Sequence, residues 1–131
     1  MATFEDVHSI ASALPEAIEG ELGHDHWTGW SVRGKRFVFE RPLRPKDVAD
    51  LDQLGERVPT GETIAVRVPA ADKEAVLASV PGAFDIPHFS GYPAVLVELA
   101  AIPVDELREL ITDGWIMQAP KRLAKAFLDG A

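Results

Sequence analysis

The sequence contains no cysteine, and this absence excludes several kinds of chemistry at once. A chain without thiols has no disulfide framework, no thiolate metal site and no cysteine nucleophile. Its 131 residues are enough for one domain to bury a core, so neither a cross-link nor a metal is needed to hold the fold together. We therefore expect a single domain over residues 1–131, stabilised by packing alone.

Two further absences bear on where the protein works. The first lysine or arginine is Arg33, so the chain does not open with the basic segment of a secretory signal peptide. The longest apolar stretch, around residues 92–97, is far shorter than the roughly 18 residues that a membrane helix needs. These features lead us to expect a cytoplasmic, monomeric protein that does not span a membrane.

Motifs for nucleotide and metal chemistry are also missing from the sequence. It has neither a phosphate-binding loop ending in Gly-Lys-Ser or Gly-Lys-Thr nor a Gly-x-Gly-x-x-Gly turn. The His-Glu-x-x-His and calcium-loop patterns do not occur either. We expect no cofactor, no bound metal and no catalytic residue, so the sequence favours a binding protein over an enzyme.

Positive charge is scarce in this chain, but it is concentrated. The formal net charge is −8, from 13 Lys and Arg against 21 Asp and Glu. Residues 1–32 contain no lysine or arginine, whereas residues 33–46 contain six and only one acidic side chain. A second basic cluster, Lys121, Arg122 and Lys125, lies near the C-terminus. An acidic protein is a poor general coat for nucleic acid, yet two basic islands suit local phosphate contacts.

Apolar periodicity and turn residues predict both helices and strands. Helices are expected over residues 4–14, 45–55, 72–80 and 103–119 and again after Pro120; strands are expected over 18–22, 30–41, 63–68 and 94–99. Thr3 and Asp6 have the spacing of a helix cap, and Trp115 lies on the apolar stripe of the longest helix. In the last helix, Leu123, Phe127 and Leu128 are expected to point inward.

The strand pattern over residues 30–41 predicts a β-hairpin. Gly34 and Lys35 fit a two-residue loop with glycine in its first position. Folding the chain there creates two apolar cross-strand pairs on one face: Val32 with Phe37, and Trp30 with Phe39.

The same register places Arg33 opposite Arg36 on the other face of the hairpin. Like charges directly opposite each other are unfavourable, so this pair gains from a nearby anion. We therefore hypothesise that the hairpin contacts phosphate groups.

Strands that follow one another as hairpin neighbours, with helices toward both ends of the chain, predict an α+β fold. We expect a two-layer sandwich in which an antiparallel sheet has helices packed on one face. The other face is expected to be open to water and to carry these side chains: Ser31, Arg33, Arg36, Thr63, Arg67 and Glu98.

Three segments carry a family resemblance: residues 32–37, residues 86–93 with the strand that follows, and Trp115 followed by residues 119–123. Together and in this order they resemble the MmcQ/YjbR-like family of small bacterial proteins. The resemblance implies the two-layer fold often compared with frataxin (CyaY-like) and DNA binding through a wing on the sheet. The helix expected over residues 45–55 looks like an insertion relative to shorter family members.

The leading candidate site is a set of basic side chains that would bind DNA or another phosphate-bearing ligand. Its members are Arg33, Lys35, Arg36, Arg41, Arg67, Lys121 and Arg122. The alternative interpretation is a solvated hairpin tip whose cations balance the acidic N-terminal region, since exposed charges seldom have a dedicated partner.

A second candidate site is the loop around His88, Ser90 and Tyr92, which would serve a small-ligand or protein-binding module without catalytic activity. A hydrolase would use Ser90 as nucleophile and His88 as base. The Gly-x-Ser-x-Gly motif is missing, however, so a stiff loop that buries its aromatic residues is favoured.

The sequence leaves more than one interpretation open for two features near the hairpin of residues 30–41. His24 and His26 alternate as two metal ligands on a strand would, but no third ligand is defined. Trp27 suits either base stacking or the core, whereas the hairpin pattern places Trp30 in the core.

Overall fold

The computed structural model describes residues 1–22 and 26–130. One sheet is built from β1 (Ala17–Leu22), β2 (Trp27–Val32), β3 (Lys35–Glu40), β4 (Thr63–Arg67), β5 (Ala83–Phe84) and β6 (Ala94–Glu98). The helices are α1 (Phe4–Ser12), α2 (Pro45–Gln53), α3 (Lys73–Ser79), α4 (Val104–Gln118) and α5 (Lys121–Leu128). Three short turns of 3-10 helix are η1 (Ala70–Asp72), η2 (Pro87–Phe89) and η3 (Leu99–Ala101).

The strands form a single antiparallel sheet in the order β1-β2-β3-β4-β6-β5. This confirms the α+β class and the antiparallel sheet of the expected sandwich. The two-residue edge strand β5 is too short to leave an alternating pattern, and the sequence did not predict it. Within the described residues, no helix is long and apolar enough to cross a membrane.

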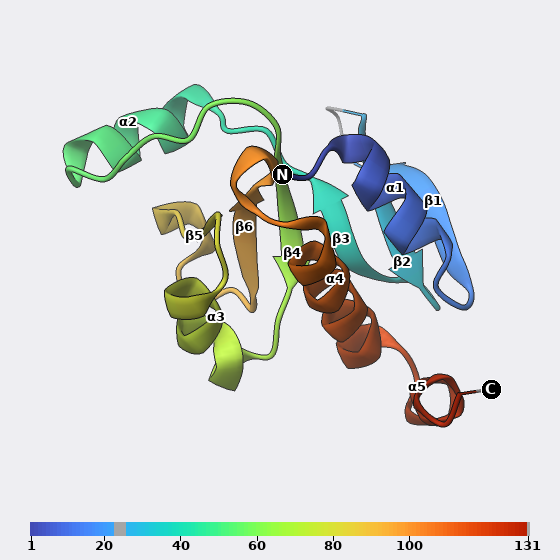
Figure 1. Ribbon diagram of the computed structural model, residues 1–131. Coiled ribbons are helices and arrows are strands. Elements are labelled where there is room, and N and C mark those ends of the chain that lie inside the picture. The colour runs from blue at the N-terminus through green and yellow to red at the C-terminus, as the bar shows by residue number, and fades with distance from the viewer. Residues whose placement is uncertain (23–25, 131) are drawn as a thin grey trace.

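Helices α1 and α4 lie across one face of the sheet (Figure 1) and enclose the larger core. Trp30 and Trp115 are fully buried there, as the sequence predicts. Each indole N–H is satisfied: that of Trp30 donates to Ser12 Oγ at 3.0 Å, and that of Trp115 donates to the Pro15 carbonyl at 3.0 Å. Buried tryptophans therefore tie both helices and the segment after α1 to the sheet.

Of the sequence predictions for the two ends of the chain, one is confirmed and one is partly wrong. The predicted cap of α1 is confirmed, because Thr3 Oγ1 accepts the Asp6 backbone N–H at 3.3 Å and Asp6 Oδ2 accepts the Thr3 N–H at 2.8 Å. In α5 the expectation fails for Leu128, which is 64% exposed, while Leu123 and Phe127 pack against the core. Leu128 is the last residue of its helix and lines an open hollow beside α4, so it is not enclosed.

The hairpin of β2 and β3 forms, but its turn lies one residue earlier than predicted. Val32 pairs with Lys35, so the loop residues are Arg33 and Gly34. Both have positive φ, 50° and 80°, which is the backbone of a type I′ turn. Arg33 lies in the turn itself, and the predicted placement of Arg33 opposite Arg36 is wrong.

A bulge in β3 changes which side chains share a face. The register shifts by one residue between Trp30 and Ser31, which leaves Phe37 as an extra residue in β3. Phe37 and Val38 both join the core under the helices, whereas Phe39 joins a cluster on the opposite face. The predicted pairing of Phe39 with Trp30 on one face is therefore wrong.

The second face of the sheet is partly covered, which corrects the expectation that it is open to water. A separate cluster packs there, made of Phe39, Leu51, Ala65, Ile86, Phe89, Ala94 and Leu96. Thr63 and Glu98 lie on this face, as predicted, but they are only 4% and 6% exposed. Helix α2 and the η2 loop supply the cover through Leu51 and Phe89, so the centre of the sheet is buried on both sides.

Candidate functional site

Arg33 is held by a carboxylate of the same chain. Its guanidinium and the Glu16 carboxylate form two hydrogen bonds, Nε to Oε1 and Nη2 to Oε2, the second at 3.0 Å. These bonds, and the attraction between the two charges, lower the pKa of Glu16 and raise the pKa of Arg33. The Arg33–Glu16 pair joins the tip of the hairpin to the segment before β1. Because Arg33 already has this carboxylate partner, we leave it out of the set proposed below, although its side chain is 57% exposed.

Arg41 is a structural arginine. It is 4% exposed, its Nη1 lies 3.0 Å from Asp47 Oδ2, and it donates to the Pro42 carbonyl at 2.6 Å. Its guanidinium lies between two rings, 5.5 Å from the centroid of Trp27 and 5.6 Å from that of Phe89. A charge enclosed in this way cannot meet a phosphate without breaking the buried pair, so Arg41 also leaves the predicted set.

Arg36 and Arg67 remain on the second face of the sheet, at the end nearest the hairpin turn. The Arg36 guanidinium lies 5.1 Å from the Phe39 ring centroid, and that of Arg67 lies 4.9 Å from the centroid of Tyr92. Arg67 Nε also donates to the Pro93 carbonyl at 3.0 Å. In the part of the chain that the structure describes, neither arginine has a carboxylate within ion-pair distance.

The other predicted basic side chains lie on β3 and at the start of α5, two segments that one hydrogen bond links near the Arg36 backbone. The side chain of Gln118, the last residue of α4, donates to the Arg36 carbonyl at 2.8 Å. This bond brings the start of α5, with exposed Lys121 and Arg122, toward the hairpin. Lys35 is exposed beside the turn. We call the set Lys35, Arg36, Arg67, Lys121 and Arg122 the basic end.

The side chain of Lys73 holds the loop around η2 in place. Lys73 Nζ donates to the carbonyls of Phe89 and Tyr92, each at 2.8 Å, and lies 3.3 Å from Asp85 Oδ1. The rings of Phe89 and Tyr92 meet edge to face, with centroids 5.2 Å apart. The predicted burial of Phe89 is confirmed, whereas the predicted burial of Tyr92 is wrong, because its side chain stays 38% exposed beside Arg67.

The hydrolase chemistry considered for the loop around His88 and Ser90 and the metal site considered at His24 and His26 have little geometric support. His88 and Ser90 are both exposed, and no hydrogen bond joins them within the described residues. Of the two histidines considered for a metal, His26 is exposed near Glu21, and His24 lies outside the described residues. The described ranges contain no group of three or more His, Cys, Asp or Glu side chains able to hold a metal ion.

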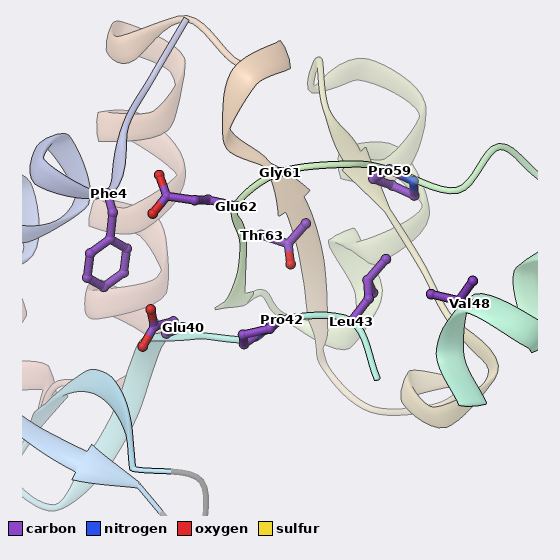
Figure 2. Close-up of a pocket in the computed structure, with 9 residues that line it drawn as sticks. All are labelled: Phe4, Glu40, Pro42, Leu43, Val48, Pro59, Gly61, Glu62 and Thr63. Atoms are coloured by element: carbon purple, nitrogen blue, oxygen red, sulfur yellow. The ribbon is translucent and has the colours of Figure 1, made fainter. Parts of the chain in front are cut away.

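A pocket that the sequence did not reveal lies at the opposite end of β3 and β4 (Figure 2). It has a volume of about 460 Å³ and opens between α1, the end of β3 and the projecting α2. Glu40, Leu43, Val48 and Glu62 contribute to its lining. Prolines before and after the predicted 45–55 helix indicated irregular backbone here. Nothing in the sequence indicated that the segments before and after this helix enclose a space.

Comparison with known proteins places the chain in a family but gives no activity. No family model matches it. Uncharacterized protein Rv2570 of Mycobacterium tuberculosis and Uncharacterized protein Mb2600 of Mycobacterium bovis are each 48% identical to it over 130 residues, covering 98% of this chain and 97% of the relative.

The crystal structure of Deinococcus radiodurans protein DR2400, a DUF419 domain, superposes with a TM-score of 0.62. The match covers 89% of this chain and 78% of that one at 17% identity, which shows a shared fold. At 48% identity over nearly the full length of both chains, the mycobacterial relatives show more than a fold. The chain belongs to the same family as these mycobacterial proteins.

Proposed function

We propose that this protein is a DNA-binding member of the MmcQ/YjbR-like family and that its basic end contacts the phosphate groups. The observation that carries the proposal is a contrast among the arginines. Arg33, Arg41 and Arg57 each meet a carboxylate of the same chain. Arg36 and Arg67 share a face of the sheet and meet only aromatic rings and a carbonyl among the described residues.

Ring contacts favour anion binding because they position a guanidinium without neutralising it. An arginine over a ring keeps its charge and its outward N–H donors while losing some side-chain freedom. Phosphate oxygens suit such donors, which bind them in pairs. Tyr92 belongs to this surface through Arg67, so the second predicted site, the loop of His88, Ser90 and Tyr92, would form one wall of the same contact.

The acidic net charge of the protein limits the expected affinity for DNA. A charge of −8 repels DNA at long range, so attraction comes only from the few cations at the contact. Each phosphate neutralised contributes a slope of about −0.9 to the plot of log affinity against log salt. The five side chains of the basic end would give a slope of at most about −4 to −5, and binding would be weak at physiological salt.

The test is a salt titration of binding to fluorescently labelled duplex and single-stranded DNA, followed by anisotropy. Arg36→Gln and Arg67→Gln together should lower the affinity at least tenfold and reduce the salt slope by about 2, because two phosphate contacts are lost. Arg108→Glu is the matched control: it reverses an exposed charge near the middle of the chain's longest helix, away from the basic end.

Equal losses in the basic-end variant and in Arg108→Glu would mean that only net charge matters, and the proposed contact would be wrong. Undiminished affinity in the basic-end variant would also show that the proposed contact is wrong. A DNA-binding role would also place the protein in the cytoplasm, where bacterial DNA lies. Fractionation of cells that express it would check this.

A further inference from the structure

The pocket beside α2 is divided into a charged side and an apolar side. Figure 2 shows the carboxylates of Glu40 and Glu62 on the side where the Phe4 ring lies, and Leu43 and Val48 toward the other side. The volume of about 460 Å³ lies within the range of roughly 300–1,000 Å³ that small-molecule sites occupy. A ligand that fills this pocket therefore needs a polar end and an apolar body.

Two ion pairs fix the pocket walls. Asp47, in the first turn of α2, forms an ion pair with buried Arg41. It also caps the helix, because its carboxylate accepts a hydrogen bond from the Arg44 backbone N–H at 2.9 Å. After α2, Arg57 donates two hydrogen bonds to buried Glu98, at 2.7 and 3.0 Å. Each of the two irregular segments that flank α2 and supply most of the lining is thus tied to the fold by an ion pair that includes a buried side chain.

Among the residues that the structure describes, the two carboxylates of the pocket have no cationic partner. Glu40 accepts one hydrogen bond, from the Thr28 backbone N–H at 3.1 Å. The exposed Glu62 side chain makes no hydrogen bond with any residue that the structure describes. Within those same residues, neither glutamate lies within ion-pair distance of a lysine, arginine or histidine. Two negative charges beside an aromatic ring form a site that favours a positive group.

We propose that this pocket binds an amphiphilic organic cation: an ammonium or guanidinium group carried on an apolar chain. The cationic group would lie between Glu40 and Glu62 beside the face or edge of Phe4, and the apolar chain would lie against Leu43 and Val48. An anionic or neutral ligand of the same shape would leave the two carboxylates without a partner. This site is separate from the basic end, and it selects the opposite charge.

The experiment compares three probes that share one chain and differ in charge: hexylammonium, hexanol and hexanoate. Binding is followed by amide chemical shifts of the full-length protein. Hexylammonium should bind about five- to tenfold more tightly than hexanol, because a partly exposed ion pair and a ring contact together contribute that much. Hexanoate should bind least, and the shifts should map to residues 40–48 and 59–63.

The variant Glu62→Gln tests the charge without disturbing the hydrogen bond that Glu40 accepts from Thr28. It should weaken hexylammonium binding about threefold or more and leave hexanol unchanged, whereas Glu74→Gln, an exposed glutamate on α3, should alter neither. Equal affinity for hexylammonium and hexanol would overturn the proposal. Hexylammonium binding that survives Glu62→Gln undiminished would overturn it too.

The same cationic group could come from a free amine or from a lysine side chain. An N-acetylated, C-amidated Leu-Lys-Leu peptide, titrated in parallel, distinguishes the two sources. Once hexylammonium binds more tightly than hexanol, tighter binding of the peptide would assign the cationic group to a lysine side chain, and weaker binding would assign it to a free amine. Failure of both to shift the pocket amides would refute it.

Discussion

At the scale of single residues, the arginines of this protein divide by what they touch. Arg33 and Arg57 meet glutamates that are 17 and 41 positions away in the sequence, so charge runs alone could not identify these partners. The sequence correctly marked residues 33–46 as basic, but it could not separate structural arginines from exposed ones. That distinction depends on which carboxylates the fold brings near.

The Arg57–Glu98 pair predicts a pH-dependent stability. The hydrogen bonds from Arg57, followed by the attraction of its charge, lower the pKa of Glu98 below its usual value near 4.5. A carboxyl group whose folded-state pKa is lowered stabilises the protein above its unfolded pKa, and this contribution is lost as the pH falls through the folded pKa. Glu98→Gln should therefore lower the free energy of unfolding at pH 7 by about 1–3 kcal/mol.

Urea unfolding at pH 7 and at pH 3 measures this effect. The gap between the Glu98→Gln variant and the unaltered protein should narrow at pH 3, because both then approach an uncharged side chain. Glu56→Gln, which changes an exposed neighbour of Arg57, should have little effect at either pH. A gap of the same size at both pH values would contradict the assigned role of the ion pair.

At the scale of elements, the sequence predicted the long, periodic segments and missed details that one residue decides. Glycine at position 34 fits a two-residue turn as either its first or its second residue. The chain uses it as the second, with Arg33 at φ 50° before it. The bulge at Phe37 then moves Phe39 to the other face. Strict alternation cannot reveal such a bulge, so the face of Phe39 was not predictable from sequence, whereas Arg36, which precedes the bulge, lies on the predicted face.

Helix α4 carries an acidic group whose environment opposes its charge. Neighbouring protein groups remove part of the hydration of the exposed Asp113 side chain and so raise its pKa, and the charges of Glu109 and Asp72 raise it further. A raised folded-state pKa means that the ionised form costs stability once the pH rises through that pKa. Asp113→Asn should therefore raise the melting temperature at pH 7, by up to about 2 °C since the site is exposed.

Thermal unfolding by circular dichroism checks this prediction, and the gain should disappear at pH 3. Asp105→Asn, in the first turn of the same helix, should have the opposite sign, because it removes a charge that the helix N-terminus favours. A lower melting temperature for Asp113→Asn at pH 7 would show that this carboxylate stabilises α4.

At the scale of the whole molecule, both faces of the central sheet are buried, and the sequence contained a signal for this. Residues 64–66 and 94–97 are continuous apolar runs, whereas a strand that faces water on one side alternates. The inward residues Ile64 and Val66 were predicted correctly. Ala65 and Leu96, between the inward positions, indicate cover on the second face as well, and the second cluster supplies it.

The spacing between the helix layer and the sheet depends on one glycine. A Cβ at Gly114 would lie 2.9 Å from the Arg67 carbonyl oxygen and 3.2 Å from that of Phe37. Gly114→Ala should therefore destabilise the protein, although alanine is better than glycine in a helix by about 1 kcal/mol. Gly20→Ala is the control, since a Cβ there meets nothing within 4 Å. A higher melting temperature for Gly114→Ala would contradict this packing.

The position of α4 in the chain has a consequence for biosynthesis. Leu107, Ile111 and Trp115 close the larger core, yet every strand of the sheet leaves the ribosome before them. Until residues 104–118 emerge, the part of the core that α4 covers has no partner, although α1 is already made, and such apolar surface is the kind that chaperones protect. We therefore expect the nascent chain to be most prone to aggregation before α4 has left the ribosome.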